Sequence, residues 1–189
     1  MSSNSHPNLP SHPPSNPSKQ YNLQTKLIHW VFLLLFIVMI VLGKVMTSVS
    51  FENPLSYYLP QYHYLLGLIL LGLVIFRFKN WWANRSMLSP TQDKTLKWLV
   101  ARVVQFCLLL CVTLLIISGY ALATMDGTPA LLPWGSWLPQ LLPNDVASEQ
   151  QLYALHEYSL MGFFTILFLH VSGALLNLIT NWRSIKRIL

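Results

Sequence analysis

The sequence predicts an all-α membrane protein, an up-down bundle of four transmembrane helices. The first observation is composition: of 189 residues, 53% are hydrophobic and only 10% are charged, which is too apolar for a soluble domain of this size. The second is the presence of four apolar stretches, each long enough to cross a bilayer as a helix, which needs about 17–25 residues. They lie at about 25–47, 62–79, 97–123 and 152–180.

Residues 1–20 differ from the rest of the chain. They are rich in Ser, Pro and Asn and lack the apolar core of a signal peptide, so they predict a disordered tail. The four helices occupy residues 21–189, which we expect to form one domain.

Basic residues indicate how the helices are oriented, because Lys and Arg of short loops gather on the cytoplasmic side. They precede the first stretch, surround the second connection and follow the fourth stretch, and these regions share one side of an up-down bundle. The other side has Lys44 and five acidic residues. Both termini and the tail are therefore expected in the cytoplasm, and the net charge of +6 is explained by topology, without a nucleic acid partner. The bases on the cytoplasmic side are Lys19, Lys26, Arg77, Lys79, Arg85, Lys94, Lys97, Arg183, Lys186 and Arg187.

Four histidines, His29, His63, His156 and His170, lie in or at the ends of the apolar stretches. Ionisable side chains at membrane depth are costly and mark functional sites. His156 and His170 are fourteen residues apart, which is about 21 Å along a helix and about 40° short of whole turns, so they share a face at two depths. His29 is near the cytoplasmic start of the first helix and His63 near the outer start of the second. The expected pairs are His29 with His170 and His63 with His156.

Two facing imidazoles without a nearby Cys or carboxylate suit the axial positions of a flat macrocycle better than tetrahedral zinc. Haem b is the expected occupant, because helix bundles build such sites from facing side chains in their cores. Two haems b at two depths would form an electron path across the membrane. The alternative for each histidine taken singly is a hydrogen-bonded residue at the membrane interface.

Four segments of the chain resemble the bacterial cytochrome b561 family over about residues 20–189. They are TKLIHWVFLLLF around His29, YHYLLGLILLGLVIFRF after His63, the SGY at 118–120, and LHEYSLMGFFTILFLHVSGALL with the last two histidines. The resemblance implies a four-helix di-haem protein of the bacterial inner membrane, with these four histidines as iron ligands and none from the third helix. It also implies oxidoreductase chemistry in the respiratory chain, since some members oxidise superoxide at the outer face and reduce ubiquinone.

The chain departs from the family pattern at three places. Gln105 replaces a histidine that relatives often have in the third helix, and Ile116 and Ile117 replace a proline before the SGY element. After His170 the segment reads NLITNWRSIKRI, with Asn177 and without the paired histidines associated with the quinone region. Electron transfer remains the expectation, whereas ubiquinone as an acceptor loses support.

Three further residues are candidates for cofactor binding. Arg77 and Lys26 would lie near the cytoplasmic haem and could pair with its propionates, or they could serve only as positive-inside anchors. Gly67, one turn beyond His63, could let a porphyrin edge approach the backbone, or it could be a small residue at a helix contact.

The connection from about 124 to 150 mixes Pro, Trp and Leu. This composition suggests an interfacial segment that lies over the outer haem. It could shield or gate that site, or merely connect two helices.

Three classes of function follow. The first is an oxidoreductase that takes electrons from superoxide at the outer face and passes them to a quinone. The second is a relay that exchanges electrons with a partner at the outer face, such as a dehydrogenase, a hydrogenase or a basic cytochrome c. The acidic outer loops disfavour superoxide and favour a basic partner. The third is a transporter that uses the histidines for metal ions or protons, and a ferric reductase is a further alternative.

Overall fold

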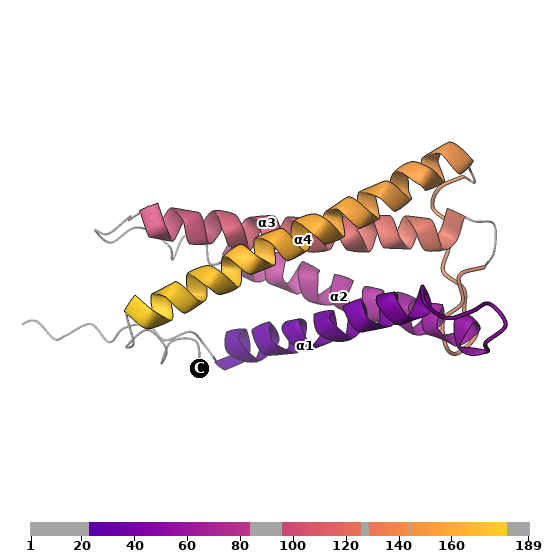
Figure 1. Ribbon diagram of the computed structural model, residues 1–189, viewed down its shortest axis with the longest axis horizontal. Helices are drawn as coiled ribbons and strands as arrows, with labels where there is room; N and C mark the ends of the chain where they lie inside the picture. Colours follow the sequence, from indigo (N-terminus) through magenta and orange to yellow (C-terminus); the bar gives the residue numbers. More distant parts are fainter. Residues whose placement is uncertain (1–22, 84–95, 126–128, 144, 181–189) are drawn as a thin grey trace, which may run out of the picture.

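Four helices make up the fold in the computed structural model, which describes residues 23–83, 96–125, 129–143 and 145–180. They are α1 (Leu23–Met46), α2 (Leu55–Ala83), α3 (Leu96–Met125) and α4 (Val146–Thr180). They run alternately up and down (Figure 1), and all four are long and apolar enough to cross a membrane. The predicted four-helix all-α fold is confirmed, whereas the tail 1–20 and Arg183 lie outside the described residues.

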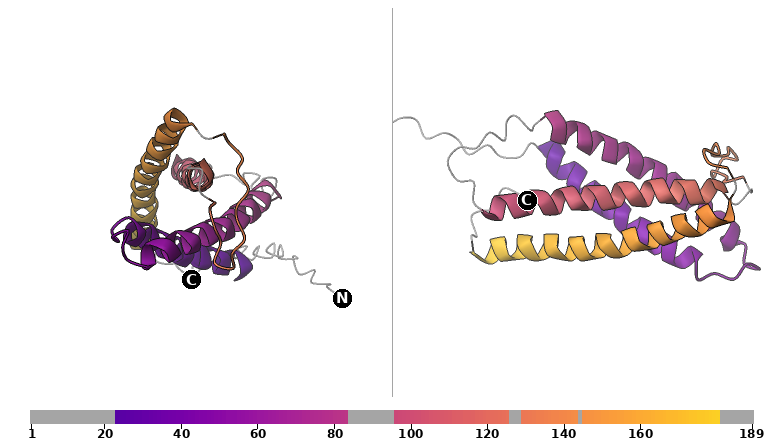
Figure 2. Two further views of the ribbon diagram at one scale, coloured as in Figure 1. Left: turned by 90° about the vertical axis from the view of Figure 1, so that its right-hand side faces the viewer. Right: turned by 90° about the horizontal axis from the view of Figure 1, so that it is seen from above.

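Helices that follow one another in the chain pack against one another, most extensively α3 against α4. Figure 2 shows α3 and α4 running side by side, with α1 and α2 inclined to them. The first and last helices are further apart, because no Cα atom of α1 lies within 8 Å of one in α4. Helices in direct contact have axes about 8–10 Å apart, so α1 and α4 meet only through their longer side chains.

A small apolar core fills the centre of the bundle, and each helix contributes to it. It consists of Phe36, Leu66, Leu70, Val74, Val112, Leu115 and Phe163. Many other large apolar side chains are exposed, and in α1 they recur every three or four residues along one face. That exposed face comprises Leu27, Val31, Leu34, Val38 and Val41. Such a surface is suited to lipid, and the protein is therefore in contact with the bilayer.

Two helices begin earlier than the apolar stretches suggest. α2 starts at Leu55, whose N–H donates to Asn53 Oδ1 at 3.0 Å, and it runs through Pro60. α4 starts at Val146 because Asp145 accepts the backbone N–H of Ser148 at 3.1 Å, as an N-cap residue does. Polar caps set both starts, so the apolar pattern alone places them too late.

Candidate haem sites

His29 of α1 and His170 of α4 face each other across the bundle. Their ring centroids are 6.4 Å apart, and the ring planes are inclined by 58°. Because the α1 and α4 backbones are well separated, these rings are among the few side chains that connect the two helices. The structure thus brings together the first histidine pair expected from the sequence.

The separation of these rings fits a shared iron. An imidazole nitrogen binds a first-row metal at about 2.0–2.1 Å and lies about 1.1 Å from its ring centre, so two imidazoles that share one iron could have centroids up to about 6.2–6.4 Å apart. The 6.4 Å between the rings of His29 and His170 lies at this limit. Imidazole is a common ligand of haem iron, so the two histidines are chemically suited to hold this group.

His63 of α2 and His156 of α4, the second expected pair, are near enough to interact electrostatically. Each ring rests against a glycine of a third helix. A Cβ atom on Gly43 of α1 would lie 3.2 Å from His63 Cε1, and one on Gly119 of α3 would lie 3.1 Å from His156 Cε1. Both distances are tighter than ordinary contacts, so the missing side chains make room for the rings.

The two pairs belong to layers that repeat every fourteen residues. After the orientation predicted from the basic residues, we call the layer of His29, Arg77 and His170 the inner layer, and the layer of Gly43, His63, Gly119 and His156 the outer layer. In α1, α2 and α4 a residue of one layer is fourteen residues from a residue of the other, or about 21 Å along the axis. Because of this repeat, one helix can contribute residues to both layers.

A third layer lies midway, seven residues from each of the other two. Its members are Phe36, Leu70, Val112 and Phe163, one from each helix, and all four are buried. The rings of Phe36 and Phe163 are 4.1 Å apart between centroids. The space between the two histidine layers is therefore filled by packed apolar side chains.

Arg77 is placed at the inner layer, where its charge acts on both His29 and His170. Its guanidinium carbon lies 5.8 Å from the ring centre of Phe32. Lys26 is half-buried one turn before His29 in α1. Gly67 lies beside Met39 of α1, whose Cε would be 3.4 Å from an added Cβ, and its role toward a cofactor stays a prediction.

Sequence reasoning did not find Gly43, Gly119 or Ser118 as parts of the site. Gly43 is fourteen residues after His29, and this spacing is a usable signal once the repeat of two layers is recognised. Ser118 and Gly119 belong to the SGY element, which carries no ligand. Their role depends on which side of α3 meets α4, and that is a property of the packed structure.

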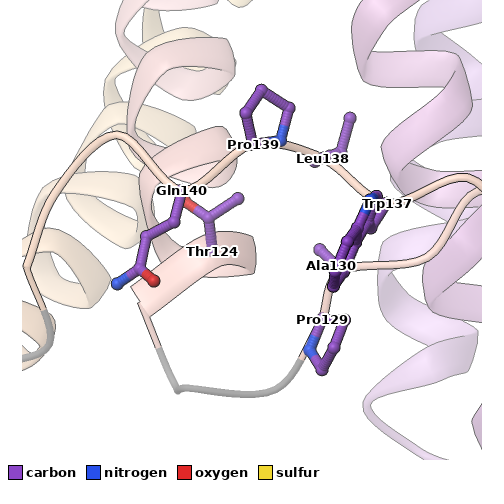
Figure 3. A pocket seen from close by; sticks show the side chains of 7 residues that line it. All are labelled: Thr124, Pro129, Ala130, Trp137, Leu138, Pro139 and Gln140. Carbon is purple, nitrogen blue, oxygen red and sulfur yellow. The ribbon is translucent and has the colours of Figure 1, made fainter.

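The connection after α3 is folded over the outer end of the bundle. Leu131 and Trp137 form an isolated bridge, Gly135 adopts a φ of 86°, which favours glycine, and Tyr120 donates a hydrogen bond to Pro139 O at 2.7 Å. Figure 3 shows the pocket that results, with Thr124 and Gln140 on one side and Trp137 on the other. Its volume is about 480 Å³. The exposed Trp134 and Trp137 suit the membrane interface.

Comparison with known proteins identifies the class. A family model described as prokaryotic cytochrome b561 matches residues 20–189, which is most of the chain. A search of curated proteins gave no match. The protein is thus a multi-pass bacterial membrane cytochrome of the b type, a class that binds haem b and transfers electrons. It belongs to the prokaryotic cytochrome b561 family.

Proposed function

We propose that this protein carries single electrons across the bacterial inner membrane through two haems b, one held by His29 and His170 and the other by His63 and His156. The observation that carries this proposal is the 6.4 Å between the facing rings of His29 and His170, repeated as a second histidine pair about 21 Å along the helices. Haem iron supplies one-electron redox chemistry, and the protein tunes it through the ligands and their surroundings.

The packed layer between the histidine layers supports this function. Phe36, Leu70, Val112 and Phe163 are at most 6% exposed, so water and ions are kept out of the centre of the bundle. An electron can tunnel through such a medium, whereas ions cannot cross it. This observation also disfavours a transporter that would move metal ions or protons between the histidines.

Arg77 and Lys26 would hold the propionates of the inner haem by charge-assisted hydrogen bonds. Arg77 is the better placed of the two, because its charge acts on both ligands of that layer. Both residues are also among the basic residues that predict a cytoplasmic location for this side of the bundle and for both termini. A fluorescent reporter fused to the C-terminus should accordingly be active inside the cell.

Liposomes that contain the purified protein test whether electrons cross the membrane through it. Ferricyanide is enclosed, and a membrane-impermeant reductant is added outside. We expect ferricyanide to be reduced in liposomes with wild-type protein, and not in those with His29→Ala or His63→Ala, since each variant would lack one of the two haems. Equal rates for wild type and for empty liposomes would contradict the proposal.

The charge at the outer end favours a basic redox protein as the partner there. Glu52, Asp145 and Glu157 are exposed at this end, and Lys44 is its single basic residue within the described ranges. Opposite charges speed the encounter of two proteins, and like charges slow it. The same acids would repel superoxide, the other donor considered, and would leave a neutral quinone unaffected.

Stopped-flow reduction separates these donors. A basic cytochrome c should exchange electrons with the protein at a rate that falls steeply as salt is added, because salt screens surface charges. Fast reduction by superoxide, followed by reoxidation with ubiquinone, would instead favour the superoxide:quinone oxidoreductase. A cytochrome c reaction insensitive to salt would exclude the acidic end as the docking surface.

A further inference from the structure

Ser118 of α3 connects that helix to the outer histidine pair. The residue is 0% exposed, and its Oγ lies 3.0 Å from His156 Nδ1. The same hydroxyl also donates to backbone carbonyls of α3, chiefly Leu114 O at 2.7 Å and at longer range Leu115 O at 3.3 Å. A buried hydroxyl is thus placed between a main-chain acceptor and a ring nitrogen.

The hydrogen-bonding capacity of serine fixes the state of the histidine. A hydroxyl has one proton to donate and two lone pairs to accept with. Since the proton of Ser118 is directed to Leu114 O, the hydroxyl oxygen accepts from His156, and the ring proton is on Nδ1. The other nitrogen, Nε2, then keeps its lone pair free for a metal.

The partner ring in the same layer is not held in this way. His63 Nδ1 is buried and has no hydrogen-bond partner among the described residues. Gly43 lies beside that ring, with 3.6 Å between a would-be Cβ and Nδ1, but it brings no side chain that could accept a hydrogen bond. The two outer histidines therefore differ, and α3 makes the difference.

We propose that Ser118 is a positioning residue of the outer haem: it holds His156 in the Nδ1-protonated form, orients Nε2 toward the iron and lowers the reduction potential of that haem. A hydrogen bond from the distal N–H of a ligating imidazole raises the basicity of the ligand, which stabilises ferric over ferrous iron. This inference rests on the proposed haem binding. It gives α3, which brings no histidine, a specific part in the site.

Redox titration of the purified holoprotein tests the proposal. In Ser118→Ala we expect the reduction equilibrium of the outer haem to shift about tenfold toward ferrous iron, which for a one-electron couple corresponds to about 59 mV. The inner haem is the internal control, and the haem that His63→Ala lacks identifies the outer one. The low-spin ferric electron paramagnetic resonance signal of the outer haem should change as well.

Two further variants separate the hydrogen bond from packing. Thr113→Val removes another α3 hydroxyl that donates to a backbone carbonyl, Leu109 O at 2.8 Å, and should leave both potentials unchanged. Ser118→Cys keeps the volume of the side chain, but its sulfur accepts hydrogen bonds only weakly, so it should shift the outer haem as Ser118→Ala does. If Ser118→Ala loses the outer haem, the reduction potential can still be measured in Ser118→Cys.

Unchanged outer potentials in both Ser118 variants would overturn the proposal. The proposal would also fail if the potential of the outer haem shifted in Ser118→Ala but not in Ser118→Cys, because the loss of side-chain volume, and not of the hydrogen bond, would then cause the shift. Wild-type protein without haem would contradict the proposed function itself, whereas two haems with potentials insensitive to Ser118 would contradict only the role of this residue.

Discussion

Gly43 and Gly119 determine how closely α1 and α3 approach the rings of the outer pair. Neither position has a positive φ, so conformational freedom does not require glycine at either of them. What requires it is space, because an added Cβ would lie 3.2 Å from His63 or 3.1 Å from His156. A methyl group at either position must push a ring that is expected to bind iron.

Gly119→Ala should therefore disturb the outer haem. The His156 ring has little freedom to yield, since Ser118 holds its Nδ1, and a shift of a few tenths of an ångström misplaces Nε2. We expect a lower outer haem content or an altered α-band in the reduced spectrum, although alanine favours a helix over glycine by about 0.5–1 kcal/mol.

Gly72→Ala in α2 is the matched control for this substitution. Gly72 is exposed, is nine residues and thus half a turn away from the face of His63, and no atom lies within 4 Å of its added Cβ, so the haem spectrum should equal that of wild type. Identical spectra for Gly119→Ala and Gly72→Ala would contradict the claim that Gly119 makes room for the ring.

At the scale of the elements, the middle layer of Phe36, Leu70, Val112 and Phe163 is as important to the bundle as the two histidine layers. Phe163 of α4 and Phe36 of α1 pack against each other between the two histidine layers. Since the α1 and α4 backbones are not in direct contact, this contact and that of His29 with His170 connect the two helices.

Phe163→Ala should destabilise the bundle strongly. Removal of a buried phenylalanine leaves a cavity and typically costs about 3–5 kcal/mol, and in a membrane, packing is a main source of helix association. The measurement is unfolding of the detergent-solubilised protein by a denaturing detergent. Phe164→Ala, at a position 44% exposed, is the control, and an equal loss in both variants would contradict a special role for the middle layer.

The start of α4 should depend on pH. Hydrogen bonds from the side chain and the backbone N–H of Ser148 hold the pKa of Asp145 below its usual value. A lowered pKa in the folded state means that the cap contributes stability above the ordinary pKa and loses it as the pH falls through the lowered one. Protection of the first turn against hydrogen exchange should fall over that acidic range.

Asp145→Asn provides the comparison for this effect. Asparagine caps helices about as well as aspartate and does not titrate, so protection of the first turn should no longer change with Asp145 protonation. Asp145→Ala should lose protection at every pH. A wild-type profile indistinguishable from that of Asp145→Asn would show that the carboxylate is not the cap.

The helix ends also illustrate what a sequence predicts poorly. The apolar stretches identify all four helices, because the membrane requires a long apolar segment for each. They place the starts of α2 and α4 too late, at 62 and 152, because Asn53 and Asp145 begin those helices by polar capping outside the apolar segments. A capping residue is recognised in a sequence only when the start of the helix is already known, because Asn and Asp are also common in loops.

In the whole molecule, each helix packs against the next one in the chain, whereas the backbones of α1 and α4 are not in contact. These two helices approach each other through side chains such as His29 and His170. The pairing of His29 with His170 could be predicted from the sequence, because spacing on one helix and alternation of direction give the depth of each residue. The parts played by Ser118 and Gly119 could not, because they depend on the rotation of α3 against α4, and the apolar pattern of α3 does not determine it.

Haem content tests the central claim most directly. The measurement is haem per chain, with reduced-minus-oxidised spectra, in purified wild type and in His29→Ala, His63→Ala and the control His29→Ala/His170→Ala. We expect two haems in wild type, one in each single variant and still one in the double variant, because its two substitutions affect the same site. Loss of both haems in the double variant alone would contradict the pairing, and wild type without haem would contradict the account as a whole.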